Sequence, residues 1–186
     1  MQETIDLIAK YGYVILFLYS LGGGFVALIG ASVLSFAGKM DLTFSIIVAV
    51  IANFIGDLML FYIARYQKAM MQPYFAKHRR KLALVHILMR KYGSIIIVIK
   101  KYIYGLKTLV PLAIALTPYS LAKFNLYNAI GAVVWGVSIG LLGYFSGGIL
   151  IKTFETLSEY PLLAPLFIAA LLGGLWLWLS RATKRN

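Results

Sequence analysis

The stretch GSIIIVIKKYIYGLKTLVPLAIALTPYS, residues 93–120, places three lysines inside a run of apolar residues. Lys100 and Lys101 follow an aliphatic run, and Lys107 precedes a second one. A charged side chain at membrane depth costs roughly 3 kcal/mol on insertion scales unless a partner compensates it, and such residues generally mark functional sites. We therefore expect this segment to hold a binding site for an anion.

The composition is that of an integral membrane protein. Of 186 residues, 61% are hydrophobic and 13% are charged, and the mean hydropathy is +0.85. Soluble domains usually carry about 25% charged residues. Because a membrane-spanning helix needs about 20 apolar residues, this length accommodates about five or six passes. We expect a single membrane domain over residues 1–186, with no separate soluble domain.

The net charge of +12 is concentrated in two places. Eight of the 18 basic residues fall between Arg65 and Lys91, and three more lie in the C-terminal tail, residues 181–186. Clustering of this kind follows the positive-inside rule and suits anionic lipid headgroups better than nucleic acid. We expect the basic loop, residues 66–92, and the C-terminus to be cytoplasmic.

Apolar runs, glycines and prolines divide the chain into segments. Gly22–Gly24 interrupt the first apolar run, and each glycine inside a helix costs about 1 kcal/mol relative to alanine. Further breaks are expected at Pro73, at Gly105 and near Pro111. The expected segments are a first hairpin at 11–40, a transmembrane helix at 42–65, an amphipathic basic loop at 66–92, a second hairpin at 93–120, a transmembrane helix at 121–151 and another at 161–180.

A broken hairpin followed by an unbroken span occurs twice, once on each side of the basic loop. With the basic loop inside and an acidic loop at 152–160 outside, the two hairpins enter the membrane from opposite faces. Paired broken segments of this kind are typical of transporters whose site lies between the repeats. We therefore predict an all-α integral membrane protein with two inverted repeats, each a re-entrant helical hairpin plus a transmembrane helix, and a C-terminal transmembrane helix.

The segment 101–111 resembles the signature of a known family. It reads KYIYGLKTLVP, and it resembles the Arg-Phe-x-Pro-Gly-x-Arg-Thr-x-x-Pro signature of the DedA family of VTT-type membrane proteins. The resemblance extends over roughly residues 17–148. Further positions match at the family's spacing, namely Gly56, Asp57, Arg65, Phe124, Asn128, Gly131, Trp135, Gly143, Tyr144 and Gly147.

This resemblance implies two inverted re-entrant hairpins in the inner (plasma) membrane of a bacterium. It also implies transport of lipid between leaflets, in bacteria chiefly of undecaprenyl phosphate that is recycled for cell-envelope synthesis. In some members this transport depends on the proton motive force, and related eukaryotic proteins scramble phospholipids. The partner that the resemblance implies is therefore an anionic lipid, either undecaprenyl phosphate or a phospholipid.

The chain departs from the family pattern at several positions. Lys101 and Lys107 replace arginines, Tyr104 replaces a proline, and Ala31 stands where the first hairpin is expected to carry an acidic residue. Arginine presents a planar fork to a phosphate, whereas lysine is a compact charge on a flexible stem. Because Ala31 has no carboxyl group, Asp57 is left as the clear carboxylate of the membrane region, and any coupling to protons would depend on it.

The resemblance and the charges together assign candidate roles in phosphate binding. Lys101 and Lys107, with Tyr104 and Gly105 between them, are expected to bind the phosphate of the headgroup. The alternative for each lysine is snorkelling, in which the stem lies along lipid and the ammonium group reaches the interface. Lys100 has no counterpart in the family, and both alternatives stay open for it.

Asp57 lies in the middle of its span, and Asn53 lies one turn earlier on the same face. Asp57 would either carry a proton or an ion, or act as the counter-charge that holds the lysines in place. Arg65 closes the same span, where it would anchor the topology at the cytoplasmic face or support the site.

These features favour a lipid transporter, or flippase, that moves undecaprenyl phosphate or a related anionic lipid. The alternative is a proton-coupled secondary transporter of a small ion or solute, with Asp57 as its proton site. An enzyme such as a membrane lipid phosphatase is not expected, because the only histidines, His78 and His86, lie in the basic loop. The chain has no cysteine, and we expect no metal and no cofactor; a homo-oligomer stays open.

Overall fold

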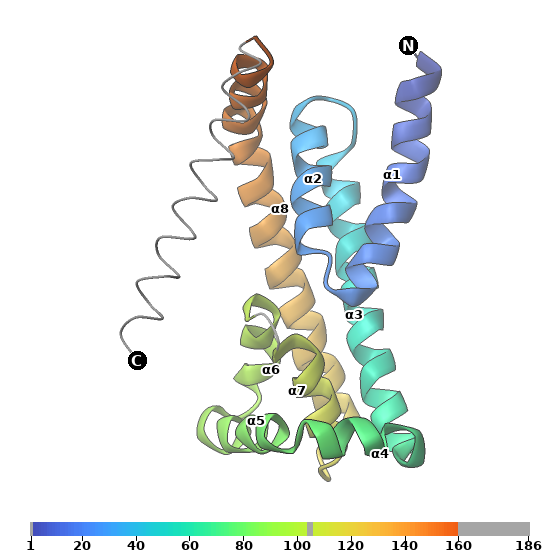
Figure 1. Cartoon of the computed structure of the whole chain (residues 1–186), viewed down its shortest axis with the longest axis vertical. Coiled ribbons are helices and arrows are strands. Elements are labelled where there is room, and N and C mark those ends of the chain that lie inside the picture. The colour runs from blue at the N-terminus through green and yellow to red at the C-terminus, as the bar shows by residue number, and fades with distance from the viewer. Residues whose placement is uncertain (1, 104–105, 160–186) are drawn as a thin grey trace. The chain divides into compact units, whose positions relative to one another are not determined.

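The computed structural model describes residues 2–103 and 106–159, and every regular element in these ranges is a helix (Figure 1). The chain divides into two compact units, residues 1–147 and 148–186. Tyr104, Gly105 and the helix expected at 161–180 lie outside the described residues. The elements are α1 (Gln2–Gly22), α2 (Phe25–Phe36), α3 (Leu42–Tyr66), α4 (Lys68–Lys77), α5 (Arg79–Tyr92), α6 (Ile95–Ile99), the 3₁₀ turn η1 (Lys100–Tyr102), α7 (Leu106–Ala115) and α8 (Leu121–Glu159).

Two of the described helices are long and apolar enough to cross a membrane, judged by length and composition. α3 has 25 residues and contains an 18-residue window with a mean hydropathy of 2.3, and the 33-residue stretch Leu121–Thr153 of α8 contains one with a mean hydropathy of 1.7. At about 1.5 Å per residue, α3 is about 38 Å long and exceeds the roughly 30 Å hydrocarbon core. Asp41 begins this helix, because its Oδ1 accepts a hydrogen bond from the Phe44 backbone N–H at 2.6 Å.

α8 continues to Glu159, beyond the end at residue 151 that the sequence predicts. The loop expected at 152–160 is therefore helical over its described part, residues 152–159. This stretch contains neither glycine nor proline, and the next residue of either kind is Pro161. Because neither helix-breaking residue occurs in the stretch, the helix continues through it to Glu159.

The first hairpin reverses at consecutive glycines. α1 and α2 lie side by side and are joined through Gly23, with a φ of +145°, and Gly24, with a φ of +57° (Figure 1). Residues with a Cβ rarely adopt such φ values, and a Cβ on Gly24 would collide with Ser20. α2 has 12 residues, so it is about 18 Å long and shorter than the hydrocarbon core.

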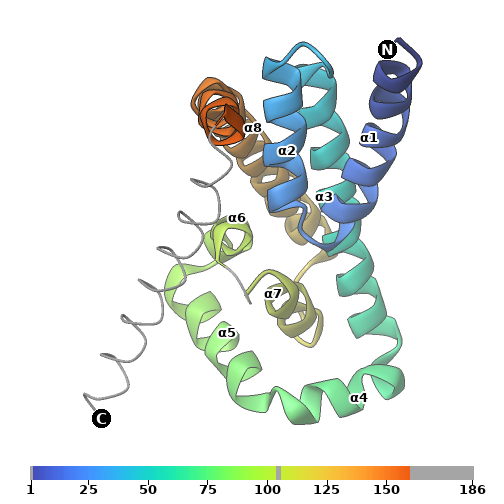
Figure 2. The same ribbon diagram turned by 45° about the horizontal axis from the view of Figure 1, so that its top comes forward.

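The second hairpin is built from shorter pieces. α6 and η1 lead into its turn, and α7 leads out of it (Figure 2). α7 has 10 residues, and its length of about 15 Å is again less than the membrane core. The break expected near Pro111 is wrong, because this proline lies inside α7. A proline removes only one backbone hydrogen bond, and packing by the surrounding protein can keep the helix intact.

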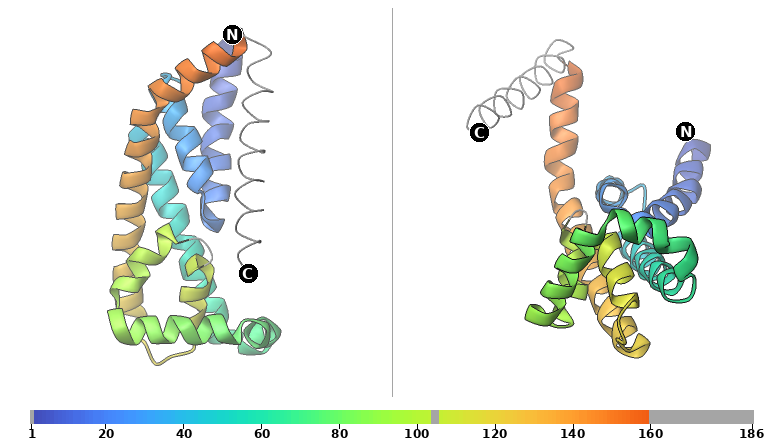
Figure 3. Two further views of the ribbon diagram at one scale, coloured as in Figure 1. Left: turned by 60° about the vertical axis from the view of Figure 1, so that its left-hand side comes forward. Right: turned by 60° about the horizontal axis from the view of Figure 1, so that its bottom comes forward.

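α4 and α5 form the basic loop and run across the direction of α3 (Figure 3). α5 packs Leu82 and Val85 into the core, while its arginines and lysines are exposed. The break expected at Pro73 is wrong, since Pro73 lies within α4 and the two helices separate at His78 instead. Pro73 is exposed, so water can satisfy the carbonyl group that it leaves unpaired.

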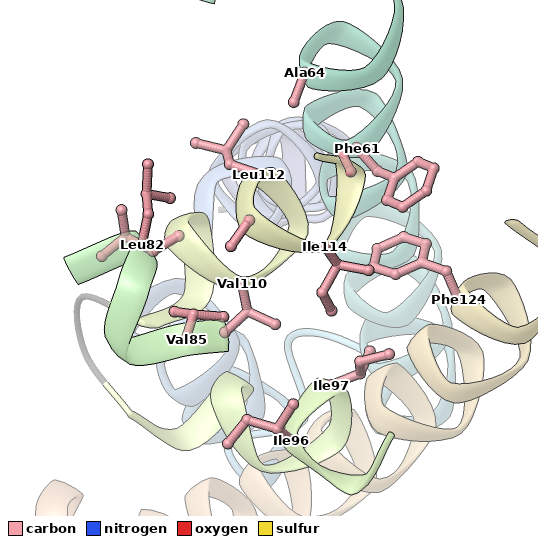
Figure 4. Close-up of a cluster of buried hydrophobic side chains, with 13 residues drawn as sticks. Phe61, Ala64, Leu82, Val85, Ile96, Ile97, Val110, Leu112, Ile114 and Phe124 are labelled. Carbon is pink, nitrogen blue, oxygen red and sulfur yellow. The ribbon is translucent and has the colours of Figure 1, made fainter. Parts of the chain in front are cut away.

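A cluster of buried apolar side chains surrounds α7 (Figure 4). Phe61 of α3 and Phe124 of α8 stack within it, with ring centroids 4.4 Å apart. The side chains of Lys100 and Lys101 in η1 are buried as well, and so is the Nζ of Lys107 at the start of α7. The buried members of the cluster are Phe61, Ala64, Leu82, Val85, Ile96, Ile97, Leu109, Val110, Leu112, Ala113, Ile114, Ala115 and Phe124.

Glycines on α8 let the neighbouring helices approach closely. A Cβ on Gly136 or Gly140 would collide with side chains of α3, and a Cβ on Gly143 or Gly147 would come within 2.8 Å of side chains of α2. Small residues at helix contacts are the usual means of close packing in membranes. Ala31 of α2 is buried in a second apolar cluster that includes residues of α1, α3 and α8.

Candidate anion site

Lys101 lies at the centre of a buried polar cluster. Its Nζ donates hydrogen bonds to Asn53 Oδ1 at 2.6 Å, to Asp57 Oδ2 at 2.6 Å and to Asn128 Oδ1 at 2.9 Å. A lysine ammonium group has three donors, so all of them are used. Lys101 thereby connects η1 to α3 and α8.

The local structure explains how this cluster forms. Asn53 and Asp57 are four residues apart on α3, so both side chains leave the same helix face. Asn128 is fixed by its own amide, because Nδ2 donates to the Phe54 carbonyl oxygen at 3.1 Å. Gly131 leaves room for the lysine stem, since a Cβ there would lie 2.9 Å from Lys101 Cε.

Lys100 also points inward. It is completely buried, and its Nζ lies 2.7 Å from Asp57 Oδ2, the same oxygen that Lys101 contacts. Snorkelling does not apply to this residue, because its ammonium group does not reach the surface. One carboxylate oxygen therefore serves two ammonium groups, and Asp57 Oδ1 has no partner among the described residues.

Lys107 differs from the other two lysines. Its Nζ is buried and has no hydrogen-bond partner in the part of the chain that the structure describes. The Nζ faces the ring of Trp135 at 5.7 Å, and a Cβ on Gly23 would lie 3.3 Å from it. Lys107 thus stands where the glycine turn of the first hairpin meets the start of α7 in the second.

The charges of the cluster do not balance. Three ammonium groups, those of Lys100, Lys101 and Lys107, lie in the cluster. Within residues 2–103 and 106–159, the carboxylate of Asp57 is their one acidic partner. Leaving a buried charge without its partner is strongly unfavourable. Ser20 Oγ and Asn53 Nδ2 are also buried and have no hydrogen-bond partner among the described residues. An arrangement with surplus positive charge and unused hydrogen-bond donors can bind an anion.

Arg65 holds the far end of the second hairpin. Its guanidinium donates to the carbonyl oxygens of Ala115 at 3.2 Å, Thr117 at 2.7 Å and Tyr119 at 3.0 Å, and it lies 4.5 Å from the ring centre of Phe61. Cations near a helix C-terminus satisfy its last carbonyls and complement its dipole. Arg65 therefore supports the C-terminal end of α7, whereas Lys107 lies at the start of this helix.

Only part of this arrangement could be predicted from the sequence. The structure brings Asp57, Asn53 and Lys101 together, places Lys107 nearby at the first hairpin, and leaves Tyr104 and Gly105 outside the described residues. It adds the side chain of Asn128, which sequence analysis noted only as a family position. The available signal was its position in the expected span, although Asn125 in the same span carries the same side chain.

The sequence model of a family described as VTT domain matches residues 5–145. The chain belongs to the VTT-domain family. This VTT-domain chain is 22% identical over 187 residues to the inner membrane protein YohD of Escherichia coli strain K12, a match that covers 100% of the chain and 97% of the relative. No solved structure matches it.

The VTT-domain chain is also similar to two further bacterial proteins. The undecaprenyl phosphate transporter A of Staphylococcus aureus is 25% identical over 159 residues, covering 77% of this chain and 78% of the relative. The protein DedA of Escherichia coli strain K12 is 26% identical over 162 residues, covering 77% and 74% respectively. The resemblance to the DedA family is thus confirmed, and the chain is a membrane protein of a transporter-type family.

Proposed function

We propose that this protein moves an anionic lipid, foremost undecaprenyl phosphate for recycling in cell-envelope synthesis, between the two leaflets of a bacterial inner membrane. The observation that carries the proposal is the buried Nζ of Lys107, which lacks a hydrogen-bond partner among the described residues. The name of the Staphylococcus aureus relative supports undecaprenyl phosphate as the lipid. The phosphate would meet Lys107 between the hairpins while the tail stays in the bilayer.

Charge neutralisation is the physical basis of this proposal. Moving a charged headgroup through hydrocarbon is costly, whereas the tail remains in a favourable environment throughout. Surplus positive charge around Asp57 would offset the charge of the phosphate at membrane depth. In this proposal Lys107 contacts the headgroup directly, since the three donors of Lys101 already bind Asn53, Asp57 and Asn128.

Reconstitution into proteoliposomes tests the proposal. Transport of labelled undecaprenyl phosphate is measured beside that of a labelled phospholipid, with and without an imposed proton gradient. We expect wild type to move undecaprenyl phosphate, Lys107→Met to lose this activity, and Lys39→Met, which removes an exposed lysine, to retain it. Transport by Lys107→Met at the wild-type rate would refute the role of Lys107.

The same experiment separates the proposal from a proton-coupled transporter of a small solute. That alternative needs Asp57 to exchange protons, yet Asp57 Oδ2 lies within 2.7 Å of two ammonium groups. We therefore expect wild type to transport lipid without an imposed proton gradient. Strict dependence on the gradient, together with indifference to the lipid, would favour the alternative.

We also propose the membrane orientation given by the charges, with α4, α5 and the C-terminus in the cytoplasm and the hairpins entering from opposite faces. The chain contains no cysteine, so single cysteines can be introduced without removing others. Cysteines at Lys68 and Arg80 should react with impermeant reagents only from the cytoplasmic side. Labelling from the opposite side would reverse this orientation.

A further inference from the structure

Lys100 occupies a position that is created by a proline. Pro111 has no backbone N–H, so the carbonyl group of Lys107, four residues earlier in α7, loses its usual helical partner. Lys100 Nζ lies 3.5 Å from this carbonyl oxygen and donates to it. The ammonium group of Lys100 is thus held at the first turn of α7, beside the backbone of Lys107.

Lys100 is not needed to neutralise Asp57. Lys101 already binds Asp57 Oδ2 at 2.6 Å and is held there by two amide oxygens as well. Among the described residues, Lys100 binds the same carboxylate oxygen and otherwise only the Lys107 carbonyl oxygen, at 3.5 Å. Two ammonium groups at one oxygen repel each other, and the charge of Lys107 adds to this repulsion. Lys100 therefore brings a surplus positive charge, one that an incoming anion would relieve.

We propose that Lys100 is a specificity-determining residue of the anion site, where it supplies the second surplus positive charge. This inference rests on the proposed function. The side chains of Lys100, Lys101 and Lys107 carry three positive charges against the one negative charge of Asp57. With Lys100 the site favours a headgroup with two negative charges over one with a single negative charge. Without Lys100 the remaining surplus matches a singly charged headgroup.

Two lipids with the same tails test this role. Phosphatidate carries a phosphomonoester that is close to doubly charged at about pH 8, and its methyl ester, phosphatidylmethanol, carries one negative charge. Binding of each lipid to the purified protein in detergent is measured for wild type, Lys100→Met, Lys100→Arg and the surface control Lys39→Met. Thermal unfolding of each variant without lipid shows whether it is folded.

Loss of one partner of a buried charge pair typically weakens binding at least about tenfold. We expect wild type and Lys39→Met to prefer phosphatidate by about tenfold or more, and Lys100→Met to lose most of that preference by binding phosphatidate more weakly. Lys100→Arg, which keeps the charge, should keep the preference. A purely structural role for Lys100 would instead weaken the binding of both lipids alike.

Failure of this inference differs from failure of the proposed function. If wild type binds both lipids equally, or if Lys100→Met keeps the wild-type preference, Lys100 does not set the charge selectivity. If wild type binds neither lipid but transports undecaprenyl phosphate in proteoliposomes, the inference fails and the proposed function stands; if it does neither, both fail. If Lys100→Met does not fold, Lys100→Gln takes its place and should lose the preference in the same way, and a wild type without the preference refutes the inference whatever the variants do.

Discussion

Asp57→Asn is expected to destabilise the fold, because the carboxylate of Asp57 neutralises two buried lysines. Its Oδ2 lies 2.7 Å from Lys100 Nζ and 2.6 Å from Lys101 Nζ, and all three side chains are inaccessible to solvent. The asparagine keeps the shape and one amide oxygen but removes the charge. The cluster would then hold its ammonium groups without a buried counter-charge from α3.

The size of the effect follows from the partners that remain. Removing one member of a buried ion pair typically costs about 3–5 kcal/mol. Lys101 would keep Asn53 and Asn128, which moderates its loss, whereas within the described residues Lys100 would keep only its 3.5 Å hydrogen bond to the Lys107 carbonyl oxygen. We expect the free energy of unfolding to fall by about 4 kcal/mol, which for a chain of this size lowers Tm by about 10 °C.

Thermal unfolding in a mild detergent, followed by tryptophan fluorescence, measures this change. Lys100→Met provides the opposite test: Asp57 keeps Lys101 as its partner at 2.6 Å, so no buried charge is left unpaired and the variant should lose far less stability than Asp57→Asn. The double variant Asp57→Asn/Lys100→Met should recover much of the lost stability. The reasoning is wrong if Asp57→Asn unfolds at the wild-type temperature, or if Lys100→Met is as damaging as Asp57→Asn.

Backbone contacts give two further predictions. Gly56→Ala would push a Cβ into the Leu21 carbonyl oxygen and should cost about 2–3 kcal/mol, whereas Gly30→Ala, with nothing within 4 Å of the added Cβ, should stabilise α2 by about 1 kcal/mol. Equal Tm values for these two variants would contradict the close contact of α1 with α3. Arg65→Met removes hydrogen bonds to three carbonyl groups and should cost about 3 kcal/mol. Hydrogen exchange should then rise mainly in α7, and an unchanged rate there would show that Arg65 does not hold its end.

Much of the helical architecture could be predicted from the sequence because hydrophobicity and turn residues act locally. The long apolar runs of α3 and α8 and the glycine turn after α1 are examples. The prolines were misread as breaks, because each removes a single hydrogen bond and tertiary contacts decide whether a helix continues. At Pro111 the freed carbonyl finds Lys100, a contact that helix periodicity cannot show.

The charged residues in an apolar stretch pointed to the candidate site, but the sequence could not show which lysine has hydrogen-bond partners among the described residues and which has none. Lys101 and Lys107 look alike in the sequence, since each is a lysine beside apolar residues. Their difference arises from Asn53 and Asn128 on other helices, which saturate the donors of Lys101 and leave Lys107 without an acceptor in the described part of the chain. Contacts between distant segments therefore decide which lysine remains available to a ligand.

Solid-state NMR of the protein in bilayers that contain undecaprenyl phosphate tests the role of Lys107 most directly. With lysine labelled at ¹⁵Nζ, dipolar recoupling to ³¹P measures the distance from each ammonium group to the lipid phosphate, and the Lys107→Met spectrum identifies the Lys107 signal. We predict a distance of about 4 Å from Lys107 Nζ to phosphorus, as expected for a charge-assisted hydrogen bond to a phosphate oxygen. A Lys107 signal that shows no coupling to phosphorus, in protein that transports the lipid, would contradict the account.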